Sequence, residues 1–472
     1  MVWTRMAAAL LAVVALTVAM VGSAVAQEAT ETAVTKQSSA AVAEVAPEED
    51  WLTQAKKPVP WLELEADFRA RFEYSKNVPF LDDHIKPNEI NRFGFRSRAG
   101  VSVKPIENLE LNARLVWEFF VFHKPNGARD VDPNEALFDK LNVTWRKTFG
   151  LDNTIVVGRQ EITDLDPWLI FDGTPLDGGR TIHFDAVRDT LELKDAQTTV
   201  DLIYIQQGGA EDKHITPFGY RAPRYFVEND EIGAIVYVRN KSIERTRIDA
   251  AYIFRHTSPA AEGMGFRSNL NTVYASVEHA FDNHWIFRAA GAEQFGQRNR
   301  VFREGVEQSD VDVWAHAFNA RLTYKFRDEW DTDAMVGYEF LSGDDKRGNF
   351  NQFDPLWGRW PQFSEIMANV YATETAPGYA TNLHRVYVGA ITRPKPFEFA
   401  LNYHLLFAHH TVPGFSESGH FRGQLLTGAA RWEVNQHIDM QLLAEVFVPG
   451  NFYGNGRENG AFFTRYEIVF KW

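Results

Sequence analysis

The chain has 472 residues, no cysteine, 14% aromatic residues and a formal net charge of -14 at pH 7. The lack of cysteine excludes disulfides, thiolate metal sites and cysteine nucleophiles, and the acidic balance argues against a nucleic-acid partner, which usually needs a basic face. A mean hydropathy of -0.31 and 24% charged residues exclude a bundle of membrane-spanning helices. These limits leave a polar, aromatic-rich chain composed largely of β-structure.

The first sixty residues contain a targeting segment and a polar leader. Arg5 precedes an apolar stretch over residues 6–21, and Ala24-Val25-Ala26 is a small-residue cleavage motif. We therefore predict a signal peptide over residues 1–26, with an uncleaved membrane anchor as the alternative. Residues 27–60 are rich in Ala, Glu, Thr, Ser and Gln, a composition that buries too little apolar surface to fold alone. We expect a flexible periplasmic leader there.

From Trp61 onward the dominant pattern has a period of two residues. Over residues 62–74 every second side chain is apolar and most of those between are charged, so one face of the predicted strand contacts an apolar environment and the other is ionic. Eighteen such segments follow one another, over residues 61–74, 92–104, 109–122, 138–148, 153–161, 184–194, 198–207, 230–239, 246–255, 271–279, 284–295, 310–325, 331–341, 383–392, 397–409, 421–434, 438–448 and 460–472.

The links between these segments alternate between short and long. Eight are short, nine are long, and the longest spans residues 342–382. Outer-membrane barrels have short periplasmic turns, long extracellular loops and both termini in the periplasm, whereas a soluble sandwich has no reason to separate loops by length. We therefore predict an all-β fold: a transmembrane antiparallel up-and-down β-barrel of about 18 strands over residues 61–472, in the outer membrane of a Gram-negative bacterium.

The last predicted strand carries an assembly signal. Phe462, Tyr466, Phe470 and Trp472 share one face of it with other apolar side chains. A C-terminal aromatic residue on an alternating strand resembles the signal that the outer-membrane assembly machinery recognises. The predicted partners are therefore outer-membrane lipids and the barrel assembly machinery, which would bind the strand that ends in Trp472.

The ionic faces of the strands must line the lumen, because a charge at the middle of the bilayer costs ~2–4 kcal/mol. These faces interleave acids with arginines, and the candidate lining residues include Arg96, Arg98, Arg114, Arg159, Arg188 and Arg465. Two interpretations stay open for any one arginine. It can belong to an ion-pair ladder that supports the wall, or to a charged lining that selects ions.

Several motifs resemble the alginate export family of outer-membrane barrels. They are Val157-Gly158-Arg159-Gln160-Glu161, Gly179-Arg180, Phe184-Asp185-Ala186-Val187-Arg188, Leu341-Ser342-Gly343-Asp344-Asp345, Phe353-Asp354-Pro355-Leu356 and residues 444–453. The resemblance implies a monomeric eighteen-stranded barrel that passes an anionic polysaccharide through an arginine-rich constriction. It assigns this role to Arg159, Arg180 and Arg188, with Asp185 as their partner. One feature departs from the family, because a short link at residues 435–437 stands where the alginate exporter has a long periplasmic loop.

The sequence thus predicts a channel for an anionic polysaccharide or oligosaccharide, with a general or anion-preferring porin for small solutes as the alternative. An outer-membrane hydrolase is the remaining rival, but no G-x-S-x-G or H-E-x-x-H motif occurs. We assign no catalytic residue, no cofactor and no metal. His409 and His410 are adjacent on a predicted strand and so point to opposite faces, and the polar loop at Asp344 is more typical of a solvated loop than of a calcium site.

Overall fold

The computed structural model describes residues 51–78, 80–125, 134–171, 183–210, 213–219, 225, 227–303, 306–375, 378–412, 419–454 and 456–472. The chain divides into two units, residues 1–54 and residues 55–472. The predicted signal peptide and residues 27–50 of the predicted leader lie outside the described residues. The end of that leader differs from expectation, because Trp51–Lys56 forms a short helix, α2.

Eighteen antiparallel strands form one sheet in the second unit. The strands of this sheet are β1 (Leu62–Lys76), β2 (Glu89–Ile106), β3 (Leu109–Lys124), β4 (Leu137–Arg146), β5 (Asn153–Gln160), β6 (Phe184–Leu193), β7 (Thr198–Gln207), β8 (Asn229–Asn240), β9 (Thr246–Pro259), β10 (Ser268–Ala280), β11 (Trp285–Arg298), β14 (Val311–Lys325), β15 (Asp333–Leu341), β16 (Leu383–Thr392), β17 (Phe397–Phe407), β18 (Phe421–Asn435), β19 (Ile438–Pro449) and β20 (Ala461–Lys471).

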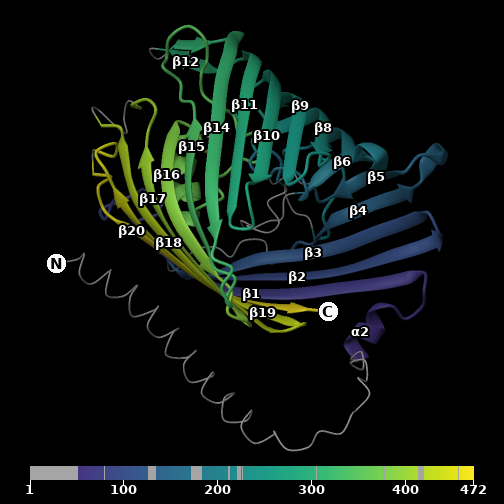
Figure 1. Cartoon of the computed structure of the whole chain (residues 1–472). Coiled ribbons are helices and arrows are strands. Elements are labelled where there is room, and N and C mark those ends of the chain that lie inside the picture. Colours follow the sequence, from purple (N-terminus) through teal and green to yellow (C-terminus); the bar gives the residue numbers. More distant parts are fainter. Residues whose placement is uncertain are drawn as a thin grey trace, which may run out of the picture. The chain divides into compact units, whose positions relative to one another are not determined.

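Each strand pairs with its neighbour in the sequence, and β1 pairs with β20, so the sheet closes on itself. Figure 1 shows the strands following one another around the ring until the last ones lie beside β1. Every predicted strand is confirmed. Two short strands, β12 (Val301–Arg303) and β13 (Val306–Gln308), form a separate hairpin in the link between β11 and β14. Two of the short turns contain the 3₁₀ helices η1 (Thr148–Gly150) and η2 (Lys194–Ala196).

The two faces of the barrel wall differ as the alternation predicts. Phe93, Val157 and Trp314 point outward with exposed fractions of 43%, 47% and 53%, whereas charged residues such as Arg69 and Glu118 are buried on the inner face. A closed ring pairs every backbone group of its strands, which is what allows β-structure to cross lipid. The fold is therefore the predicted transmembrane barrel, and the protein belongs in the outer membrane of a Gram-negative bacterium.

The closing strand has the predicted outward row of aromatic side chains. Tyr466 lies opposite Phe72 of β1, and Phe470 lies opposite Phe68. Tyr466 and Phe470 are 44% and 42% exposed, as expected for side chains that face lipid. The aromatic row of β20 thus continues onto the first strand, across the closure of the barrel.

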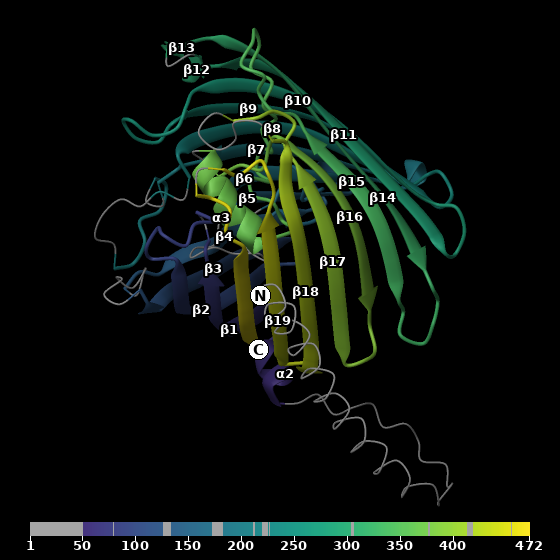
Figure 2. The same ribbon diagram turned by 90° about the vertical axis from the view of Figure 1, so that its left-hand side faces the viewer.

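The core of the unit lies inside the barrel, where two loops pack against each other. One links β5 to β6 and is described over residues 161–171; the other spans residues 342–382 and contains helix α3 (Glu365–Glu374). Figure 2 shows α3 within the ring of strands. Leu165, Ile170, Leu356, Trp357 and Met367 are all at most 4% exposed. The predicted long loop is therefore a folded part of the lumen rather than an extracellular flap.

No helix among the described residues is both long and apolar enough to span a membrane.

Candidate permeation pathway

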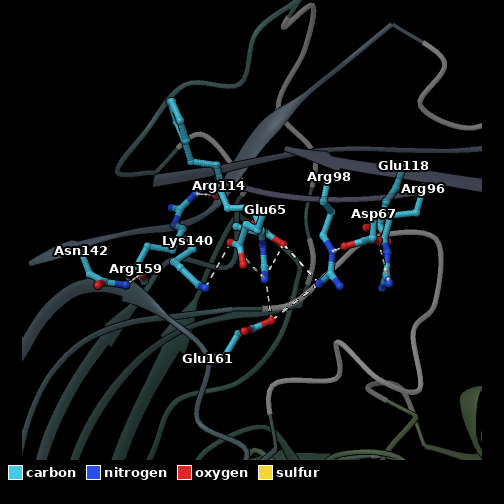
Figure 3. Close-up of polar contacts among 12 residues, drawn as sticks. Glu65, Asp67, Arg96, Arg98, Arg114, Glu118, Lys140, Asn142, Arg159 and Glu161 are labelled. Atoms are coloured by element: carbon cyan, nitrogen blue, oxygen red, sulfur yellow. Dashed lines mark hydrogen bonds and ion pairs between the residues drawn. The ribbon is translucent and has the colours of Figure 1, made fainter. Parts of the chain in front are cut away.

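A β-bulge in β4 concentrates charge on the inner wall. The register between β3 and β4 shifts between Arg114 and Leu115, so Asp139 is an extra residue in β4. Asp139 and Lys140 therefore both reach into the lumen, although strict alternation would send Asp139 outward. Arg114 donates to both carboxylate oxygens of Asp139 at 2.9 and 2.8 Å. It also donates to Glu161 at 2.7 Å (Figure 3). Sequence reasoning missed Asp139 because it does not identify the bulge.

A second cluster lies next to the first on β1 and β2. Asp67 accepts hydrogen bonds from Arg96 at 3.3 Å and from Arg98 at 2.5 Å (Figure 3). Arg98 is also 3.8 Å from Glu161, which links the two clusters. The structure thus places Arg96, Arg98 and Arg114 in the lumen, as predicted, but uses them in an ion-pair ladder that joins strands.

Arg465 connects the wall to the inserted helix. Its guanidinium is 2.7 Å from Glu73 of β1 and 2.9 Å from Glu365 at the start of α3. The same helix end is held by Glu445 of β19, which accepts hydrogen bonds from the Ser364 hydroxyl and from the backbone amides of Glu365 and Ile366. An acid is favourable there because the first amides of a helix lack internal partners.

Arg188 connects the wall to the other inserted loop. It donates to both oxygens of Asp164 at 2.7 Å each and to Asp201 of β7 at 2.9 Å. Arg239 of β8 binds the same two acids at 3.0 and 2.6 Å. Burial would raise the pKa of Asp164, but the hydrogen bonds and charge of Arg188, with the charge of Arg239, outweigh it and lower this pKa to about 2.

Arg159 does not line the lumen with Arg188, so this part of the predicted constriction is wrong. Along β5, Val156 lies opposite Arg188 and contributes to an interior cavity. Arg159 is three residues further along, on the face of the exposed Val157, where it is 3% exposed and bonded to Asp185 at 2.8 and 3.0 Å. Strand alternation separates the two arginines. Arg180, the third predicted member, lies outside the described residues.

The loop over residues 161–171 reaches from its own strands to the far wall. Asp166 accepts hydrogen bonds from Tyr274 of β10 and Arg288 of β11. Trp168 donates to Glu339 of β15 at 2.9 Å, and its ring stacks with that of Phe353 in the other loop at a centroid distance of 6.0 Å. Strands on both sides of the lumen therefore fix this loop.

The loop over residues 342–382 crosses the lumen as well. On one side, Trp357 and Arg359 donate to the fully buried Glu231 of β8 at 3.0 and 2.6 Å. On the other, Glu374 at the end of α3 accepts two hydrogen bonds of 2.8 and 2.7 Å from Arg422 of β18. Together the two loops fill part of the barrel and determine which spaces remain open.

One space left between the loops and the wall is a cavity of about 990 Å³, here named the arginine-lined cavity. Its wall includes a row of side chains that lie directly opposite one another on four adjacent strands: Arg247, Glu278, Arg288 and Arg321. Arg321 is exposed to the cavity and, among the described residues, has no carboxylate within ion-pair distance. The opposite side is formed by inserted-loop residues such as Trp360 and Phe363.

A second space of about 540 Å³, the hydroxyl-lined cavity, lies along β3–β8. Its described lining residues are Glu110, Asn112, Lys140, Asn142, Thr144, Thr154, Val156, Gln160, Glu161, Asp164, Arg188, Thr190, Glu192, Thr199 and Arg239. Of the residues that the structure describes, Asp164 is the one that lines both cavities. The clamped Asp164 carboxylate therefore marks the boundary between them.

Among the described residues, no group of three or more His, Cys, Asp or Glu side chains is arranged to hold a metal ion. In the polar loop, Asp344 and Asp345 accept hydrogen bonds from backbone amides, those of Asn351 and Arg347. His409 accepts a hydrogen bond from the amide of Gly343 at 3.1 Å through Nδ1. These groups serve the structure of the loop.

Neither a protein-family model nor a curated protein sequence matches the chain. Solved structures from Pseudomonas aeruginosa do match. OpdK, solved with vanillate, has a TM-score of 0.53 and 10% identity over 87% of this chain and 98% of that one. OccK8 (OprE) gives 0.53 and 10% over 87% and 98%, and OccK5 (OpdH) gives 0.52 and 11% over 86% and 97%. These are outer-membrane porins rather than enzymes, and the chain shares their barrel fold; membership of the alginate export family receives no support from them.

Proposed function

We propose that the protein is an outer-membrane porin for small organic solutes that prefers carboxylates, and that they move along the arginine-lined cavity. This is the alternative that the sequence left open beside polysaccharide export. The fold supports a channel in general, and the charge of the cavity wall supports the preference for anions.

The observation that carries the proposal is the pair Arg288 and Arg321. The two residues are directly opposite on β11 and β14 and both line the cavity. Like charges directly opposite in a sheet destabilise it. Arg288 is offset by Asp166 and by Asn319 at 3.0 Å, whereas Arg321 keeps its charge exposed to the cavity. An unneutralised guanidinium in a confined path attracts carboxylates, to which it can donate two parallel hydrogen bonds.

The aromatic part of the cavity suits the carbon skeleton of such a solute. The guanidinium of Arg385 lies over the rings of Phe363 and Tyr387, 4.2 and 4.4 Å from their centroids. All three residues line the cavity. The structural neighbour OpdK was solved with vanillate, an aromatic carboxylate. This match supports a small carboxylate as the solute class.

The two inserted loops count against the passage of a long polymer. Loop 342–382 is bonded to β8 on one side and to β18 on the other, and loop 161–171 packs against it. A polysaccharide chain would need both loops to leave the lumen. We therefore prefer the porin function to alginate-like export.

The test compares two solutes of one carbon skeleton, gluconate and its neutral analogue sorbitol, in proteoliposomes. The uptake of gluconate should exceed that of sorbitol for the wild type, and the excess should fall in the Arg321→Gln variant. Arg245→Gln is the control, because Arg245 is half-exposed in a short turn outside the cavities. Equal uptake of the two solutes by the wild type, or no uptake of either, would contradict the proposal.

A further inference from the structure

The hydroxyl-lined cavity differs in chemistry from the arginine-lined cavity. Four threonines, two asparagines and one glutamine supply its uncharged polar groups, and Val156 is the one apolar residue among the described lining residues. Hydroxyl and amide groups can both donate and accept hydrogen bonds. A wall of this kind is complementary to a solute whose own groups also donate and accept hydrogen bonds.

The charges in this lining are largely neutralised within the wall. Lys140 is 3.3 Å from Glu65, and Glu161 is 2.7 Å from Arg114. Glu110 is 2.9 Å from Arg146, while Arg188 and Arg239 share Asp164 and Asp201. Glu192 accepts a hydrogen bond of 3.1 Å from Thr199. The cavity therefore lacks the exposed unpaired arginine of its neighbour.

The two cavities are separated by a fixed group. Asp164 is held by Arg188 through two hydrogen bonds and by Arg239 through a third. The separation is therefore maintained by charge-assisted hydrogen bonds, which are the stronger kind.

From these observations we infer that the hydroxyl-lined cavity is a second solute site, and that it takes small neutral polyols while carboxylates use the arginine-lined cavity. At about 540 Å³ the cavity is within the size range of small-molecule sites. Thr154 of β5 lies opposite Thr190 of β6, and Thr144 of β4 lies opposite Val156, two residues along β5 from Thr154 and on the same face. Their hydroxyls are spaced along one face, as a polyol chain with successive hydroxyls requires. The inference rests on the channel function proposed above and adds a second class of solute to it.

The absence of cysteine from the chain allows a direct test. Thr154→Cys introduces a single thiol into the hydroxyl-lined cavity, and Thr427→Cys introduces the matched thiol into the arginine-lined cavity. Each variant is reacted with a bulky thiol reagent, and the uptake of sorbitol and gluconate into proteoliposomes is compared before and after labelling.

Labelling of Thr154→Cys should slow sorbitol and spare gluconate, and labelling of Thr427→Cys should do the reverse. Without any label, Thr154→Val should lower sorbitol uptake about fivefold at low concentration, the effect of losing one hydrogen bond to the solute. Both labels slowing both solutes alike, or the label on Thr154→Cys slowing neither, would overturn the second site. A wild type that transports neither solute would instead overturn the channel function itself.

Discussion

Arg188 of β6 holds Asp164 of the inserted loop through two parallel hydrogen bonds of 2.7 Å. The resemblance to the alginate export family assigns Arg188 to a constriction. In the structure, Arg188 instead positions the loop that divides the lumen. The wall and the loops of this barrel are joined by such contacts, and the shape of the open space depends on them.

Loss of this contact should loosen the loop more than it weakens the barrel. Asp164 is about half exposed, so its pairing with Arg188 contributes ~1 kcal/mol at most. We expect Asp164→Asn, which leaves the pairing of Arg188 with Asp201 in place, to keep its fold and thermal stability within a few degrees of the wild type, but to show larger current fluctuations in planar bilayers. Arg146→Gln is the control, since Arg146 pairs with Glu110 within the wall. Equal current noise in both variants would show that the hydrogen bonds between Arg188 and Asp164 do not restrict the motion of the loop.

The hydrogen bonds between Arg188 and Asp164 should be lost in acid. The pKa of Asp164 is lowered to about 2, below the ordinary carboxyl value of about 3.8. Its stabilising contribution is therefore complete above about pH 4 and is lost as the pH falls through about 2. Current noise should rise in this acidic range for the wild type, whereas Asp164→Asn should be noisy already at neutral pH. A wild type with the same noise at pH 2 and pH 6 would contradict the assignment.

Helix α3 should become less firmly held in the lumen when Glu445, which accepts hydrogen bonds at its N-terminus, is substituted. Glu445→Gln replaces one of the two oxygens that accept from Ser364, Glu365 and Ile366 with an amide group that cannot accept, so at least one of these hydrogen bonds, worth ~0.5–1.5 kcal/mol, is lost. We expect a lower temperature of unfolding and a higher single-channel conductance, because α3 occupies the lumen. Glu433→Gln, at an exposed site near the end of β18, should change neither. Unchanged conductance of Glu445→Gln would show that α3 does not restrict the path.

Assembly should depend on β20. We propose that the barrel assembly machinery recognises this strand and that the folded protein is a monomer. Deletion of residues 466–472 removes the partners of Asp67–Phe72, which make up most of the pairing between β20 and β1. The backbone groups left unpaired on β1 cannot face lipid. The truncated protein should be degraded and should lose the heat-modifiable migration of a folded barrel. Normal folded levels of this protein would contradict the dependence.

The strands could be predicted because lipid and lumen impose a strict period of two on each of them. The same rule failed where the backbone departs from it. Asp139 enters the lumen through a bulge, and Arg159 lies on the face of Val157, although both strand alternation and the resemblance to a motif had assigned it to the lumen. Along β5 the adjacent valines Val156 and Val157 point to opposite faces, so the sequence does not show which face of this strand meets lipid.

The inserted loops could not be predicted, because inward folding is decided by contacts between distant segments. Glu231 meets Trp357 and Arg359 across more than 120 residues of sequence. One local signal was present. Ser364 caps α3, and the buried residues Ile366, Met367, Val370 and Tyr371 follow it with helical spacing. That pattern identifies a helix with a buried face, although not the barrel interior as its location.

The preference of the pore for anions is measured by the reversal potential across a planar bilayer under a salt gradient. The wild type is compared with the Arg288→Gln/Arg321→Gln double variant. Both substitutions keep a polar side chain but remove the opposed charges on β11 and β14. We predict an anion-selective potential for the wild type, a shift toward zero for the double variant, and no shift for Arg245→Gln. A cation-selective or unselective wild type, or a double variant with unchanged selectivity, would contradict the account.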